Sequence, residues 1–210
     1  MGITIYARGN MDRLEDIPHL IEEVKRIAQK HDWTFSVVDD DFDVVPSTCL
    51  VGPTADKPAV IKGSLGLKGI VLSVDSQCEA LAILFDKSGA LTDVMQQLVR
   101  SSCGMQQEPF TACKTQFGRI ESHIQIVELL HALNSKYISN LSVTDEGDYW
   151  ESGDVEQLSN KRKVLEHYLD YAKDVISGIR LPEKASLGSD TIAAQIEQAL
   201  LKAEEDQIIH

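Results

Sequence analysis

The sequence has few cysteines, and their spacing matches neither a metal site nor a disulfide framework. Four cysteines occur in 210 residues, with no CxxC pair and no histidine at zinc-site spacing, so we expect reduced thiols. The sequence also lacks a run of eighteen apolar residues and a basic start followed by an apolar segment. It therefore predicts no membrane span and no export signal. Together these absences predict a cytoplasmic protein.

Positive charge is scarce as well. Lys and Arg number 20 against 33 Asp and Glu, which gives a formal net charge of −13. Binding to nucleic acids or anionic membranes depends largely on cationic side chains that neutralise phosphate, so we expect neither partner. A small molecule or another protein remains as the expected partner. Hydrophobic residues make up 43% of the chain, which is enough for a packed core at this length.

The sequence predicts the same order of strand, helix and strand in two separate segments. Residues 3–43 and residues 110–150 each predict a short strand, an amphipathic helix and a second strand that ends in carboxylates. The offset between the two segments holds within about two residues, as expected for copies with slightly different helices. The sequence therefore predicts an α+β fold with duplicated βαβ units related to the ferredoxin-like arrangement. Two such copies packed about a pseudo-twofold axis would bring their acidic ends into related positions.

The rest of the chain predicts a connection, a β-meander and C-terminal helices. Three prolines and three glycines in residues 44–66 indicate a long connection without regular structure. A central meander is predicted over residues 68–89, a short helix over 91–100, and longer helices over 154–178 and 189–203. We expect one domain over residues 1–210, with two related halves (about 1–100 and 108–155) plus C-terminal helices over 155–206. These helices would cover a sheet face or form a homodimer interface.

Acidic residues follow both predicted strand pairs and form a candidate metal site. Asp39 and Asp40 end the first unit, and Asp145 and Glu146 end the second. Convergent carboxylates are the ligands that divalent metals such as Mg²⁺, Mn²⁺ or Ca²⁺ require. Acidic residues after a strand are also ordinary turn formers. The sequence leaves both readings open.

The helix of the second unit carries a candidate catalytic residue. His123 shares the apolar face of this helix, and Lys114 lies on the strand that it would face. An imidazole that points at the sheet can serve as a base or a ligand. The alternative is a core histidine held by hydrogen bonds.

An aromatic pair follows the acidic end of the second unit. Tyr149 and Trp150 stand in a turn beside carboxylates, which suits recognition of a ligand with a flat apolar face. The same residues would equally pack the last helices against the core. Ligand binding and packing are therefore the two interpretations of this pair.

Three strings carry a family resemblance: CKTQF at 113–117, ESHIQIVELLHAL at 121–133 and NLSVTDEGDYWESGD at 140–154. Together they resemble an uncharacterised family of bacterial proteins, mainly over residues 113–154. The resemblance implies a bacterial cytosolic protein and no mechanism. If the recurring residues of this family sit together, they are Lys114, Gln116, His123, Asp145, Glu146, Tyr149 and Trp150. The first unit lacks the Gly-Asp-Tyr-Trp ending, so a symmetric double site is not expected.

The sequence thus favours a cytosolic module that binds a ligand or a partner, with Gln116, Tyr149 and Trp150 as ligand-binding candidates. One alternative is a divalent-metal-dependent enzyme, such as a hydrolase, with His123 and Lys114 as catalytic candidates. Another alternative is an acidic inhibitor or immunity-type protein that covers a basic partner.

Overall fold

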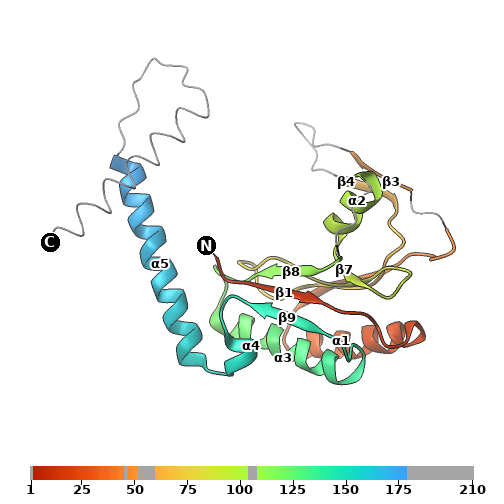
Figure 1. Ribbon diagram of the computed structural model, residues 1–210, viewed down its shortest axis with the longest axis horizontal. Helices are drawn as coiled ribbons and strands as arrows, with labels where there is room; N and C mark the ends of the chain where they lie inside the picture. The colour runs from red at the N-terminus through yellow and green to blue at the C-terminus, as the bar shows by residue number, and fades with distance from the viewer. Residues whose placement is uncertain (1, 45–46, 52–59, 104–107, 179–210) are drawn as a thin grey trace, which may run out of the picture. The chain divides into compact units, whose positions relative to one another are not determined.

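The computed structural model describes residues 2–44, 47–51, 60–103 and 108–178 (Figure 1). The chain divides into two compact units, one of Gly2–Leu158 and one of Met1 with Ser159–His210. The first unit holds both sheets and the core. The described part of the second unit consists of most of one helix, α5 (Val155–Gly178), whose first turn belongs to the first unit.

Two antiparallel sheets and a hairpin make up the β structure of the described residues. In the first sheet, β1 (Thr4–Arg8) lies between β8 (Thr111–Lys114) and β9 (Ser142–Asp145) and pairs antiparallel with both. The second sheet has the order β2 (Thr34–Asp39), β5 (Lys68–Ser73), β6 (Leu81–Phe85), β7 (Leu91–Thr92). Strands β3 (Ser47–Val51) and β4 (Val60–Ser64) form the hairpin. The α+β class predicted from the sequence is confirmed.

Helices pack on both sides of these sheets. Figure 1 shows α1 (Ile17–Lys30) and α3 (Ile120–Lys136) together on one side, and α2 (Val94–Cys103) on the other. The apolar stripe predicted for the first helix is the face that α1 buries, with Leu20 and Val24 fully inaccessible. Every residue of β6 is buried because its alternate side chains enter two core clusters, one on each face of the sheet.

The start of α1 depends on both a local sequence signal and a tertiary contact. A one-turn 3₁₀ helix, η1 (Leu14–Asp16), leads into α1, and Pro18 lies in the first turn of α1, where a missing N–H removes no helical hydrogen bond. Asp12 and Glu15 have the spacing of a capping box, but no side-chain cap forms. Asp12 instead accepts hydrogen bonds from Ser139, at distances of 3.0 and 3.2 Å from the backbone N–H. A tertiary contact therefore replaces the local cap.

Two parts of the sequence-based description differ from the structure. Residues 44–66 are predicted to lack regular structure, yet they contain β3 and β4, because one short β-rich run lies between two prolines and another follows the last proline. A further short helix, α4 (Tyr149–Ser152), precedes α5. The helix predicted over 189–203 lies outside the described residues. Within the described part of the chain, no helix has the length and apolar character needed to cross a bilayer.

The two predicted βαβ units sit differently in the sheets. Strands β8 and β9 of the second unit flank β1 within one sheet, whereas β1 and β2 of the first unit belong to different sheets. Their internal duplication stays a prediction. The difference matters for the site, because the two acidic strand ends, at β2 and β9, are in separate sheets.

Candidate functional site

Most of the residues singled out in the second unit meet at one end of the three-stranded sheet. Because β8 and β9 both run antiparallel to β1, their carboxyl ends lie on either side of its first residues. Lys114 is opposite Thr4, and Asp145 is opposite Ile5. The strand topology therefore brings together residues that are about 30 positions apart in the sequence.

A buried hydrogen-bonded chain of Thr115, His123 and Asp145 lies at the centre of this cluster. Thr115 Oγ1 is 2.7 Å from His123 Nδ1, and His123 Nε2 is 3.1 Å from Asp145 Oδ2. The exposed fractions of the three residues are 1%, 0% and 4%. The carboxylate of Asp145 can only accept, so Nε2 of His123 carries a proton and donates it to Asp145 Oδ2.

The carboxylate of Asp145 organises the turn after β9. Its Oδ1 accepts from the backbone N–H of Gly147 at 2.7 Å, and its Oδ2 accepts from those of Tyr149 and Trp150 at 2.8 and 3.0 Å. Burial opposes ionisation of this group, but the hydrogen bond from His123 and those from the backbone donors outweigh it, and the pKa of Asp145 lies below its usual range. The ionised carboxylate is thus the hub that fixes α4 against β9.

This chain has the residue order of a hydroxyl–imidazole–carboxylate triad, but its geometry is that of a closed core network. Both ring nitrogens of His123 have partners, and the ring has no exposed surface. A substrate has no open position beside Thr115 Oγ1, which also lies 3.3 Å from the Ile3 carbonyl. The core interpretation of His123 describes this arrangement, although its partners are Thr115 and Asp145.

The other predicted site residues of the second unit also lie at this end of the sheet, where they make separate contacts. Glu146 Oε2 accepts from the Thr4 N–H at 2.8 Å, and Gln116 is buried. Lys114 is partly exposed, and its ammonium lies 5.8 Å from the centroid of the Phe117 ring.

The aromatic pair packs on α3. The Tyr149 ring meets His123 edge-on at 6.4 Å, and Trp150 stacks on His131 with ring centroids 3.8 Å apart and planes 7° apart. Both aromatic residues are partly buried against the main core. Packing, one of the two interpretations drawn from the sequence, accounts for these contacts.

The acidic residues at the end of β2 have partners of their own, which differ from the partners of those at the end of β9. Asp39 pairs with Lys68 at 2.8 Å, and Asp40 Oδ2 accepts from the N–H groups of Leu65 and Leu67 at 2.9 and 3.2 Å. Within residues 2–44, 47–51, 60–103 and 108–178, no three His, Cys, Asp or Glu side chains are grouped to hold a metal ion. The turn-forming interpretation describes Asp40, and a surface ion pair describes Asp39.

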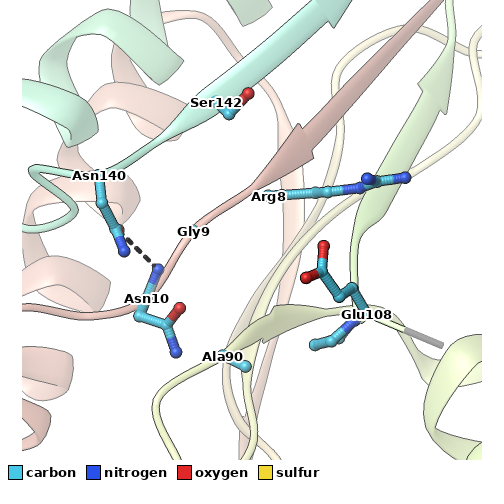
Figure 2. Close-up of a pocket in the computed structure, with 8 residues that line it drawn as sticks. Arg8, Gly9, Asn10, Ala90, Glu108, Asn140 and Ser142 are labelled. Carbon is cyan, nitrogen blue, oxygen red and sulfur yellow. Dashed lines mark hydrogen bonds between the residues drawn. The ribbon is translucent and has the colours of Figure 1, made fainter. Parts of the chain in front are cut away.

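A polar pocket at the opposite end of β1 was missed by the sequence reasoning. Its volume is about 420 Å³, and it lies where β1 ends, β9 begins and the chain enters β8 (Figure 2). The residues that line it are Arg8, Gly9, Asn10, Ala90, Glu108, Pro109, Asn140 and Ser142. Figure 2 shows the Arg8 side chain extending from β1, with the Glu108 carboxylate directed towards it.

Strand alternation explains why Arg8 faces this pocket. Ile5 and Ala7 point into the core, so Arg8 points to the opposite face, and Ser142 is its partner on β9. Beyond Arg8 the chain approaches the 138–141 turn closely. A Cβ on Gly9 would lie 2.7 Å from Ile138 Cγ2, and the N–H of Asn10 donates to Asn140 Oδ1 at 2.9 Å. In the sequence, Gly9-Asn10 indicated only the end of a strand.

A second hollow, of about 480 Å³, lies between the start of α1 and β2. Apolar residues such as Ile17, Ile21 and Val37 line it. Charged residues at this hollow are already paired, since Lys25 contacts Glu22 at 2.7 Å and Lys68 contacts Asp39 at 2.8 Å. The charged side chains of this second hollow therefore form ion pairs, whereas Arg8 and Glu108 of the first pocket form none with a described residue.

Comparison with known proteins identifies no relative of this chain. No family model matches the chain, and neither a curated protein nor a solved structure matches it significantly.

Proposed function

We propose that this protein binds a small polar ligand in the pocket beside Arg8. Arg8 and Glu108 both line this pocket, yet neither forms an ion pair within 4.0 Å with any described residue. This observation is the main support for the proposal. The contact made by the Arg8 guanidinium is with the Phe110 ring, at 5.5 Å from its centroid. A guanidinium and a carboxylate held beside each other without pairing are both open to a ligand.

Uncharged groups of the pocket add hydrogen-bonding capacity. No described residue hydrogen-bonds the Asn10 side chain or the Ser142 hydroxyl, and Asn140 uses only its Oδ1. Ligand pockets usually combine a few convergent polar groups with a volume of about 300–1,000 Å³. The volume of about 420 Å³ places this pocket at the small end of that range.

The contrast with the hollow between α1 and β2 strengthens the choice of site. There, each lysine has an acidic partner within 2.8 Å, so the protein satisfies its own charges. Beside Arg8 the charges are left for another molecule. The hydrolase and inhibitor alternatives stay predictions of the sequence, and the geometry described above does not single out either of them.

A ligand screen by thermal unfolding tests the proposal. The full chain would be screened with a library of small anions, cations and zwitterions, and then Arg8→Gln and Ser142→Ala would be compared with Arg13→Gln. Arg13 is an exposed arginine paired with Glu15 at 2.9 Å, and it does not line the pocket. We expect a saturable rise in the unfolding midpoint that Arg8→Gln abolishes and Arg13→Gln retains. Equal responses in these two variants would reject the pocket as the site.

A further inference from the structure

We propose that the ligand of the Arg8 pocket is a zwitterion of the α-amino acid class; this inference rests on the function proposed above. Arg8 and Glu108 carry opposite charges and line the same hollow. An anion alone would be attracted by Arg8 and repelled by Glu108, and a cation alone would meet the reverse. A molecule with adjacent carboxylate and ammonium groups can pair with both side chains at once.

Arg8 is the partner for the ligand carboxylate. A guanidinium presents several N–H donors in a planar fork that matches the two oxygens of a carboxylate. Ser142 lies directly opposite Arg8 in the β1–β9 register, so its hydroxyl can donate to the same carboxylate. The guanidinium carbon lies 5.5 Å from the centroid of the Phe110 ring, and no described residue accepts a hydrogen bond from the guanidinium N–H groups.

Glu108 is the partner for the ligand ammonium. An ammonium group has three donors and no acceptor. The Glu108 carboxylate and the side-chain oxygen of Asn10 are acceptors on the lining of the pocket, and neither is hydrogen-bonded to a described residue. Both types of ligand group therefore find a matching partner in the same hollow.

The size of the pocket restricts the ligand further. Three of its lining residues, Gly9, Ala90 and Pro109, have small side chains or none. At about 420 Å³ the hollow suits a free amino acid better than a nucleotide. Among the described residues that line the pocket, Arg8 is the one cationic side chain, which also disfavours a ligand with several phosphates.

Calorimetric titration of the full chain with amino acids and their blocked derivatives tests the inference. A panel of free amino acids identifies the tightest binder, and its methyl ester and N-acetyl derivatives then remove one charge each. We expect each derivative to bind at least about tenfold more weakly than the free amino acid, because each loses a charge-assisted hydrogen bond. In Arg8→Gln the preference for acid over ester should disappear, and in Glu108→Gln the preference for free amine over N-acetyl should disappear. Both replaced residues are exposed, so we expect both variants to fold, with circular dichroism as the check.

The outcomes separate this inference from the function on which it rests. If no amino acid binds while singly charged compounds bind in an Arg8-dependent manner, the zwitterion inference is overturned and the pocket stands. If no compound binds through Arg8, both are overturned. Equal affinity of an amino acid and its two derivatives would also overturn the inference, because neither charge would then be recognised.

Discussion

Replacement of Asp145 by asparagine tests whether the buried carboxylate is a structural hub. Asp145 Oδ2 accepts three hydrogen bonds and Oδ1 accepts one, from Gly147. The least damaging asparagine rotamer keeps its oxygen at the Oδ2 position. Its NH₂ group then faces the Gly147 N–H, so that two donors meet in a buried site.

The expected magnitude follows from this geometry. A buried donor without a partner costs about 1–3 kcal/mol, and the three retained bonds lose the strength that comes from a charged acceptor. Removal of the charge also removes its burial penalty, which offsets part of the loss. We therefore expect Asp145→Asn to lower the free energy of unfolding by about 2 kcal/mol, a substantial part of the about 5–15 kcal/mol typical of a domain.

Asp39→Asn is the matched control. Asp39 also follows a strand, but its side chain is 72% exposed and pairs with Lys68 at the surface. Surface ion pairs contribute about 0–1 kcal/mol, so the control should change stability little.

Urea unfolding followed by tryptophan fluorescence provides the assay, since Trp33 and Trp150 both lie in the Gly2–Leu158 unit. An equal loss in Asp145→Asn and Asp39→Asn would refute the reasoning. So would a metal-dependent stabilisation that either variant abolishes.

Three further predictions concern pH, packing and metals. Hydrogen bonds from the backbone N–H groups of Gln77 and Arg119 hold the pKa of Asp75 well below its usual range, and the pKa of Asp145 is also lowered. Each carboxylate then contributes stability above the unfolded-state pKa of about 3.9 and loses it as the pH falls through the lower folded-state pKa. Urea midpoints should fall below about pH 4, with a shallower slope in Asp145→Asn. Gly118→Ala should destabilise the protein, because the added Cβ would lie 2.2 Å from Cys78 Sγ, and Cys78→Ala in the same chain should restore part of the loss in thermal unfolding. Chelator-treated protein should show no saturable shift of its unfolding midpoint with Mg²⁺, Mn²⁺ or Ca²⁺, since no group of ligands is assembled among the described residues.

Local sequence was enough to locate most helices and strands. The apolar spacing over residues 17–28 predicts the buried face of α1, and the β-rich run at 34–39 coincides with β2. These features depend on backbone geometry and side-chain periodicity over a few neighbouring residues, so no distant contact is needed to recognise them. The hairpin of β3 and β4 was missed because prolines and glycines dominate the composition around it.

The pocket beside Arg8 lay beyond what the sequence could predict. Arg8 and Glu108 are 100 positions apart, and they meet only because β1 lies beside β8. Nothing in the local pattern around either residue indicates that its charge stays unpaired. By contrast, the gathering of Lys114, Asp145 and Glu146 beside the start of β1 follows once β8 and β9 are known to flank that strand.

Asp39 and Asp145 show the difference between what the sequence predicts and what the fold determines. Both residues end a strand after a Ser-Val pair, and the sequence alone predicts the same acidic chemistry for both. Only the tertiary structure separated them: β2 is the outer strand of its sheet, and the side chain of its terminal carboxylate stays in solvent. At the end of β9, His123 of α3 and the turn into α4 enclose the carboxylate and supply four donors. Burial and partners depend on what packs against a residue, and distant segments of the chain determine that.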